Sequence, residues 1–156
     1  MAARFRAAFD GGSRGNPGIA AWGVAILDGD GSCVEGHGGF LGQATNNVAE
    51  YNGLLAAIRL AVERGADSVE LFADSELIVK QLQGTYRVKN PGLKPLFREA
   101  KRLIAGFSSF RISHVRREHN KDADRLVNQT LDRAEANPED LTIRVYEDCR
   151  VRPDGV

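Results

Sequence analysis

Several residue types that usually mark a special environment are scarce in this sequence of 156 residues. It has two cysteines, Cys33 and Cys149, whose spacing fits neither a metal site nor a disulfide framework. We therefore expect free thiols in a reducing cytoplasm, and a single disulfide is the less favoured alternative. Segment 1–10 lacks the apolar stretch of a signal peptide, and no apolar run is long enough to span a membrane. These absences predict a cytoplasmic protein with no membrane association.

The overall composition fits one globular domain. Hydrophobic residues make up 42% of the chain and charged residues 27%, which is typical of soluble proteins. A chain of 156 residues can bury a substantial core without dividing into two domains. The sequence contains no internal repeat and no low-complexity segment, and we expect a monomer.

The net charge is zero, but the charges are unevenly distributed along the chain. Residues 76–125 carry 12 basic and 5 acidic side chains, whereas residues 1–75 carry 5 basic and 9 acidic ones. A positive middle segment beside an acidic region suits a polyanion held over bound cations. The alternative is a solvated surface of mixed charge, and the charge distribution alone favours that alternative.

The spacing of apolar residues predicts an α/β chain. Alternating patterns predict strands at 4–10, 20–28, 33–41, 68–74 and 110–116. Helical spacing predicts helices at 48–62, 75–83, 94–105 and 120–136. The first three strands would form an antiparallel meander, and a right-handed crossover through the first helix would lay the fourth strand parallel to the first. The expected fold is a mixed five-stranded sheet flanked by helices.

A domain boundary is predicted near residue 136. Residues 1–136 contain all of the predicted strands and helices, and we expect them to form the functional domain. The tail 137–156 opens with N-P-E-D and has one short apolar stretch, at 141–146. That stretch fits a short extra strand, and a disordered tail is the alternative.

Four acidic residues lie in distinctive local sequences that are far apart in the chain. They are Asp10 in F-D-G-G-S-R-G-N-P-G, Glu50 in T-N-N-V-A-E-Y, Asp74 in L-F-A-D-S and Asp124 in N-K-D-A-D-R-L-V-N. Asp10 and Asp74 end strands that we expect to be parallel neighbours, so both carboxylates would emerge at one sheet edge. Taken singly, each could be a plain turn or helix-start residue. Together they predict a cluster neutralised by Mg²⁺ or Mn²⁺, with two ions about 4 Å apart able to promote phosphoryl transfer.

Three further segments carry groups that could serve the same site. The glycines of G-G-S-R-G-N-P-G, at 11–18, would let the backbone approach a phosphate, although an ordinary hairpin loop fits equally well. The side chains of T-N-N, at 45–47, can cap the following helix or reach sugar hydroxyls. Before Asp124, either Glu118 or His119 could act as an acid–base group that assists product release.

In this order, the motifs D-G-G-S-x-G-N-P-G, T-N-N-x-A-E, D-S and N-x-x-A-D resemble those of the type 1 ribonuclease H family. The resemblance covers residues 4–135 and implies the ribonuclease H-like fold. It also implies metal-dependent cleavage of the RNA strand of RNA–DNA hybrids, leaving 5′-phosphate and 3′-hydroxyl ends. The metal-binding catalytic carboxylates would be Asp10, Glu50, Asp74 and Asp124. The residues that would contact the hybrid are Gly11, Gly12, Ser13, Asn16, Thr45, Asn46, Asn47 and Glu76.

The sequence departs from the best-known members of this family in three places. Residues 81–93 link two helices without the family's basic protrusion, and Arg87 and Lys89 are the basic residues within them. Glu76 stands where many members have a neutral amide. The loop before Asp124 is short and lacks the pattern G-H-x-G, so the role of the family's mobile histidine stays open. Its R-E-H-N sequence instead resembles a subgroup of small bacterial and archaeal members.

Two other functions fit parts of the sequence. The fold could serve as a nucleic-acid-binding domain without catalysis, but the presence of all four carboxylates argues against this. It could also be the core of another phosphotransferase, such as an exonuclease or a transposase. The T-N-N and G-N-P-G segments disfavour that possibility.

Overall fold

Pairing between β1 (Arg4–Gly15) and β4 (Ser68–Ala73) is parallel, as the sequence predicts, and it organises the sheet. The computed structural model describes residues 3–151. Its other strands are β2 (Gly18–Leu27), β3 (Cys33–Ala44), β5 (Ser109–His114) and β6 (Arg144–Asp148). The strand order is β5-β4-β1-β2-β3-β6, and β1 to β3 form the expected antiparallel meander. The predicted mixed α/β sheet is confirmed, with six strands instead of five.

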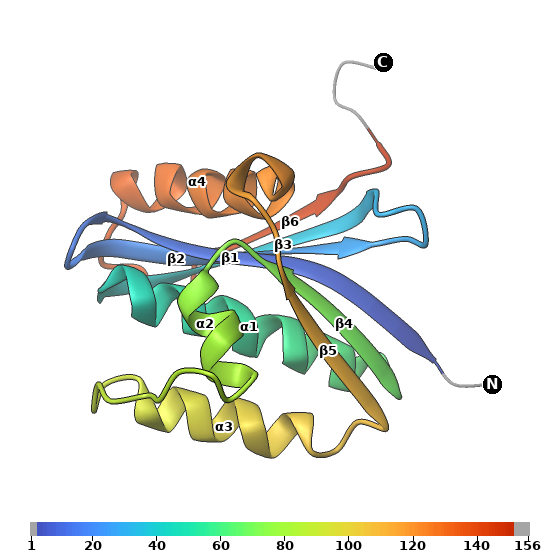
Figure 1. Cartoon of the computed structure of the whole chain (residues 1–156). Helices are drawn as coiled ribbons and strands as arrows, with labels where there is room; N and C mark the ends of the chain where they lie inside the picture. Colours follow the sequence, from blue (N-terminus) through green and yellow to red (C-terminus); the bar gives the residue numbers. More distant parts are fainter. Residues whose placement is uncertain (1–2, 152–156) are drawn as a thin grey trace.

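Helices cover both faces of the sheet (Figure 1). They are α1 (Asn46–Glu63), α2 (Glu76–Leu82), α3 (Lys94–Ile104) and α4 (Lys121–Ala136), with a 3-10 helix at Arg117–His119. The hydroxyls of Thr45 and Ser75 accept hydrogen bonds from the first turns of α1 and α2, which fixes where these helices begin. Helices α1 to α3 lie on one face and α4 lies on the other. None of the described helices is long and apolar enough to cross a membrane.

The main hydrophobic core lies between the sheet and α1. The strands contribute buried side chains such as Phe9 and Leu71. Helix α1 contributes Leu54 and Ile58, both fully buried. Burying one such side chain stabilises the fold by roughly 1.5–3 kcal/mol, so this layer fixes α1 against the sheet. A smaller core holds α4 on the opposite face, where Leu126 is fully buried.

The C-terminal tail contributes the sixth strand. Strand β6 pairs antiparallel with β3, and the register places Glu35 opposite Asp148. One residue further along, Cys149 forms a disulfide with Cys33, and their Cα atoms are 5.7 Å apart, within the usual range. The expectation of free thiols is therefore wrong. Strand pairing brings together two cysteines that are 116 residues apart, and no sequence spacing reveals that pairing.

The glycine-rich segment is part of a strand, where the sequence predicted a turn. Strand β1 pairs with β2 as far as Gly15 opposite Gly18, so the chain reverses only at residues 16–17. The pairing of β1 with β4 stops earlier, at Phe9 opposite Ala73. Asp10 therefore lies inside β1, but it is the first residue beyond the β1–β4 ladder. Its side chain emerges where the two parallel strands part.

Two glycines allow the backbone of α1 to lie directly against the backbone of β1. A Cβ atom on Gly11 would lie 2.1 Å from the carbonyl carbon of Ala49 in α1. A Cβ atom on Gly53 of α1 would lie 2.5 Å from the carbonyl oxygen of Asp10. Real side chains do not fit at such distances. Gly11 and Gly53 therefore serve close helix packing, and Glu50, next to Ala49, is held beside β1.

We expect Gly11→Ala to lower the free energy of unfolding by about 1–3 kcal/mol, because the added methyl group would force α1 away from β1. Gly12→Ala is the matched control, since a Cβ atom there would lie 3.5 Å from Cγ1 of Val127, in ordinary van der Waals contact. Urea-induced unfolding measures both stabilities. Equal stability of the two variants would contradict this account of the helix contact.

Candidate active site

Three of the four predicted carboxylates meet where the parallel strands part. Asp10 is the first residue of β1 beyond its ladder with β4, and Asp74 directly follows β4. Glu50 reaches them from the first turns of α1. The carboxylates of Asp10, Glu50 and Asp74 each offer an oxygen, and these oxygens all lie within 4.8 Å of one another. Side chains from three elements thus form one acidic cluster.

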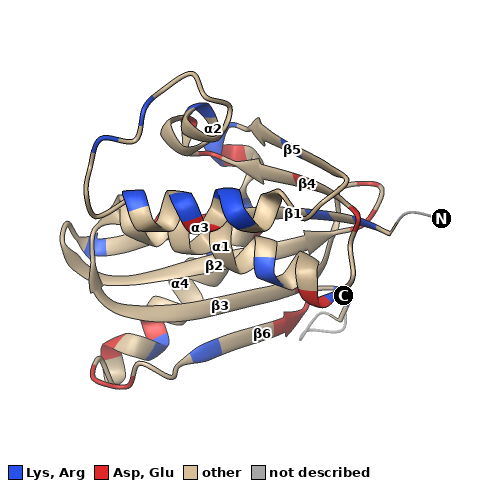
Figure 2. Ribbon diagram, turned by 90° about the horizontal axis from the view of Figure 1, so that it is seen from below, with Lys and Arg blue, Asp and Glu red and all other residues tan. Residues whose placement is uncertain are grey.

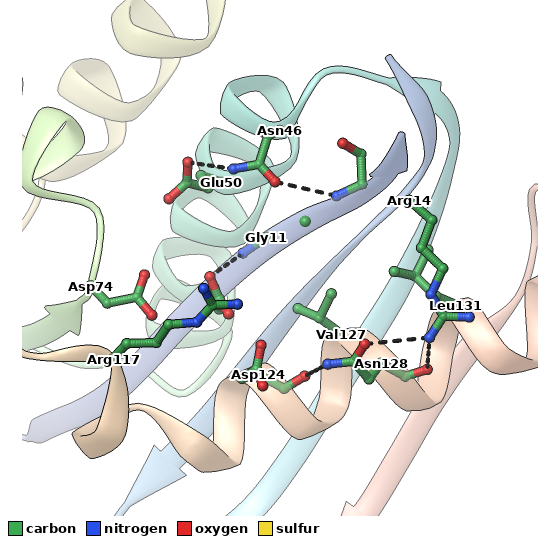
Figure 3. A pocket seen from close by; sticks show the side chains of 13 residues that line it. Gly11, Arg14, Asn46, Glu50, Asp74, Arg117, Asp124, Val127, Asn128 and Leu131 are labelled. Atoms are coloured by element: carbon green, nitrogen blue, oxygen red, sulfur yellow. Dashed lines mark hydrogen bonds between the residues drawn. The ribbon is translucent and has the colours of Figure 1, made fainter. Parts of the chain in front are cut away.

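The fourth carboxylate, Asp124, comes from the first turn of α4. It lines the same cleft as the other three, in a cavity of about 360 Å³ (Figure 3). The cleft lies at the junction of β1, α1 and α4, so both helical layers contribute to it. Its lining residues are Asp10, Gly11, Gly12, Ser13, Arg14, Asn46, Glu50, Asp74, Arg117, Asp124, Val127, Asn128 and Leu131.

Asn46 connects the acidic cluster to the glycine-rich strand (Figure 3). Its Nδ2 donates a hydrogen bond to Oε1 of Glu50 over 3.2 Å, and its Oδ1 accepts one from the backbone N–H of Ser13 over 3.3 Å. The backbone N–H of Asn46 donates to Oδ1 of Asn16 over 3.1 Å. This amide therefore orients the Glu50 carboxylate and ties the start of α1 to the β1–β2 hairpin.

The surroundings of Asp10 disfavour its charged form. Burial is the largest cause, the Asp74 carboxylate is the second, and the charges of Asp124 and Glu50 add to them. Together they raise the pKa of Asp10 to about 8. The backbone N–H of Gly11 donates to Oδ1 of Asp10 over 2.9 Å and partly opposes this rise.

Glu50 is perturbed in the same direction. Burial, with the charge of Asp74 as the second cause, raises the pKa of Glu50 to about 7. Hydrogen bonds from Ser75 and Asn46 oppose the shift. Closely spaced carboxylates that resist ionisation in this way fit a hard divalent cation, because its charge would stabilise all of the ionised forms together. The donor set is oxygen only, which is the set that Mg²⁺ and Mn²⁺ prefer.

Arg117 is a cleft residue that the sequence analysis missed. It extends from the 3-10 helix before α4 toward the carboxylates (Figure 3). Glu118 and His119 are exposed on the same turn and do not line this cleft. The sequence R-R-E-H-N offered two adjacent arginines, and only the turn geometry distinguishes Arg117 from Arg116. A role for Glu118 or His119 in product release stays a prediction.

Four predicted substrate residues do not line the cleft. Thr45 caps α1 by accepting a hydrogen bond from its backbone, and Asn16 accepts one from the first residue of α1. Asn47 is exposed in the first turn of α1. Glu76 is exposed at the start of α2 and forms an ion pair with Lys80, with 2.7 Å between the charged atoms. By contrast, the predicted residues of 11–13 do line the cleft.

A protein-family comparison matches the segment that contains the four carboxylates. A family model described as reverse transcriptase-like matches residues 8–130, which is most of the chain. The chain belongs to this family. The chain is also similar to proteins named as ribonucleases H. This similarity confirms the predicted membership of the type 1 ribonuclease H family.

Two curated relatives illustrate the match. Ribonuclease HI of Halobacterium salinarum is 46% identical over 131 residues, which cover 84% of this chain and 66% of that protein. A bifunctional protein of Mycobacterium tuberculosis is 43% identical over 126 residues, which cover 80% of this chain and 35% of that protein. The chain thus spans about two thirds of the first relative and about one third of the second.

Solved structures match the fold closely. The crystal structure of RNase H1 from Halobacterium salinarum has a TM-score of 0.80 and 46% identity, and the match covers 84% of this chain and 99% of that one. LC11-RNase H1, solved in complex with an RNA/DNA hybrid, has a TM-score of 0.78 and 39% identity, with the same coverage of 84% and 99%. These two ribonucleases H therefore share the fold of this chain over 84% of its length.

We expect Asp10→Asn to become more stable relative to the wild type as the pH rises from about 4 to about 8 in the absence of metal. The folded-state pKa of Asp10 is raised from an ordinary 3.8 to about 8. The stability linked to its protonated form is full below the unfolded-state pKa and is lost as the pH rises through the folded-state pKa. An asparagine loses nothing over this range.

Thermal unfolding in EDTA at a series of pH values measures this difference. Asp30→Asn, in the exposed turn between β2 and β3, is the control. Adding Mg²⁺ at pH 8 should then stabilise the wild type more than Asp10→Asn, because a bound ion stabilises the state that binds it. A stability difference that does not change with pH would contradict the electrostatic account of the cluster.

Proposed function

We propose that this chain is an endoribonuclease that uses divalent metal ions to hydrolyse the RNA strand of RNA–DNA hybrids, leaving 5′-phosphate and 3′-hydroxyl ends. The observation that carries the proposal is the meeting of Asp10, Glu50 and Asp74 within 4.8 Å, with Asp124 in the same cleft. The relative named ribonuclease HI and the neighbour solved with an RNA/DNA hybrid support the choice of substrate.

In this proposal, Asp10, Glu50, Asp74 and Asp124 hold two ions, either Mg²⁺ or Mn²⁺. Bound ions of this kind neutralise charge on the attacking and leaving oxygens and lower the pKa of a water nucleophile. The protein supplies a cleft in which Glu50 is buried and Asp10, Asp74 and Asp124 are half-buried. Asn46 orients Glu50 through the hydrogen bond to Oε1, and the N–H of Gly11 orients Asp10.

We assign the discrimination between the RNA strand and the DNA strand to amide and backbone groups near the carboxylates. A 2′-hydroxyl donates and accepts hydrogen bonds, and it distinguishes RNA from DNA at a given site. Asparagine amides can meet both needs. The groups proposed to contact the hybrid are Gly11, Gly12, Ser13, Asn16, Thr45, Asn46, Asn47 and Glu76. Because Asn16 and Asn46 are hydrogen-bonded to each other, they would present a preformed surface to the minor groove.

Arg117 is proposed to contact the phosphate that is cleaved. Arg117 lines a cleft that also holds four carboxylates, yet it forms no ion pair with them among residues 3–151. A positive group held near the cluster without being neutralised by it suits an anionic ligand. A role for the neighbouring Glu118 or His119 in releasing the product remains part of the proposal.

The remaining expectations complete the proposal. Residues 1–136 form the catalytic domain, and residues 137–156 form a tail, of which β6 is the described strand. The protein acts as a monomer on hybrids in the cytoplasm, without membrane association. The basic residues of 76–125 are the first candidates for contacts with substrate phosphates, and α3 carries four of them, all exposed: Lys94, Arg98, Lys101 and Arg102 (Figure 2).

A cleavage assay tests the proposed function. The purified protein is incubated with Mg²⁺ or Mn²⁺ and with labelled RNA–DNA hybrid, duplex DNA or duplex RNA. We expect cleavage of the RNA strand of the hybrid, and we expect Asp10→Asn to abolish it, because the proposed metal site would lose one of its carboxylates. Binding of hybrid without cleavage by the wild type would favour a silent nucleic-acid-binding domain. Cleavage of the duplex DNA would favour another phosphotransferase.

We expect Arg117→Ala to lower kcat/KM on the hybrid by about 10–100-fold, which corresponds to losing a hydrogen bond between charged groups. Arg116→Ala is the matched control, because Arg116 is the neighbouring exposed arginine and does not line the cleft. Steady-state kinetics at fixed metal concentration measures both variants. Equal losses in the two variants would mean that position 117 contributes only to the general positive charge of the loop.

A further inference from the structure

Asn120 is a buried amide that the mechanism above does not use. Only 2% of it is exposed, and it immediately precedes α4 at the N-cap position. An asparagine in this position ordinarily accepts a hydrogen bond from the first turn of its own helix. Here the side chain makes no such capping bond, and its Oδ1 has no partner within residues 3–151. The side chain is therefore used for something other than starting the helix.

The amide instead reaches across the fold to β1. Its Nδ2 donates a hydrogen bond of 3.0 Å to the backbone carbonyl of Phe9, a residue 111 positions away. That carbonyl belongs to the peptide group that joins Phe9 to Asp10, at the point where the β1–β4 ladder ends. Asn120 thus holds the backbone of β1 where the backbone loses its β4 partner.

The same residue also holds the other side of the cleft. Its carbonyl accepts the backbone N–H of Asp124 over 3.2 Å, and its own N–H donates to the carbonyl of Arg117 over 3.0 Å. Two successive hydrogen bonds through Asn120 therefore join the backbone at Asp10 to the backbone at Asp124. This matters because Asp124 lies outside the group of three carboxylates that meet within 4.8 Å.

We propose that Asn120 is a positioning residue that sets the spacing between Asp10 and Asp124, and through it the affinity of the site for divalent metal. The proposal rests on the function proposed above. Removing the Nδ2 donor would leave both carboxylates present but let α4 shift relative to β1. Hydrogen bonds that orient the groups of a metal site without touching the metal typically change metal affinity or activity by about 10–100-fold.

Asn120→Ser separates this role from helix capping. Serine is as good an N-cap residue as asparagine, but its side chain is too short to reach the Phe9 carbonyl. Thr130→Val is the matched control, because Thr130 is also buried in α4 and its hydroxyl donates to Leu126 within the same helix, over 2.7 Å. This control removes one buried hydrogen bond from α4 without touching β1.

The first measurement is a titration with Mn²⁺ followed by the shift in thermal midpoint, which needs no cleavage. We expect Asn120→Ser to require about 10–100-fold more Mn²⁺ for half of the shift, and Thr130→Val to match the wild type. The second measurement is cleavage kinetics at saturating metal, where kcat of Asn120→Ser should fall while KM for the hybrid stays unchanged.

An unchanged Mn²⁺ requirement in Asn120→Ser would overturn the proposal, and so would an equal change in Thr130→Val. Asn120→Ala, which lacks the donor and adds no charge beside the carboxylates, replaces the serine variant if that variant does not fold. If neither folds while Thr130→Val does, Asn120 is structural and the proposal fails. Wild-type protein that binds Mn²⁺ but cuts no hybrid would defeat the proposed function while the titration still tests Asn120.

Discussion

At Gly11 and Gly53 the backbone of α1 touches the backbone of β1 with no side chain between them. This contact determines how far Glu50 stands from Asp10, because Glu50 lies between the two contact points along the helix. A larger residue at either glycine would displace the whole second turn of α1. The core beneath the helix, with Leu54 and Ile58 fully buried, keeps the two backbones pressed together. Hydrophobic burial therefore holds α1 against the sheet. The lack of a Cβ atom at Gly11 and Gly53 lets the two backbones lie this close.

The same contact forces like charges together. Nothing in the described chain neutralises Asp10, Glu50 and Asp74 with a direct ion pair, although eleven such pairs occur elsewhere in it. Burial first, and the charge of Asp74 second, raise the pKa of Asp10 to about 8 and that of Glu50 to about 7. Packing holds these carboxylates together without a neutralising ion pair. The site therefore favours a cation that binds from outside the chain.

Most of the fold could be read from the sequence, because apolar spacing reports which face of each element is buried. The four carboxylates could also be found, since each lies in a short sequence whose form depends on local turns and helix starts. The features that the sequence did not predict depend on contacts between distant segments. Arg117 and Arg116 have the same chemistry, and only the turn before α4 decides which one enters the cleft. Gly11 looked like a loop residue because the backbone of α1, against which it packs, is not visible in a local pattern.

The disulfide between Cys33 and Cys149 closes most of the chain into a covalent ring. Glu50, Asp74 and Asp124 lie inside this ring, whereas Asp10 lies on the N-terminal arm outside it. A single break of the backbone anywhere within the ring would leave both fragments joined as one molecule. Such a nicked chain keeps all four carboxylates in one covalent molecule for as long as the disulfide is oxidised. Reduction would turn the same nick into a true division of the protein, so the redox state determines how much damage to its backbone this chain can tolerate.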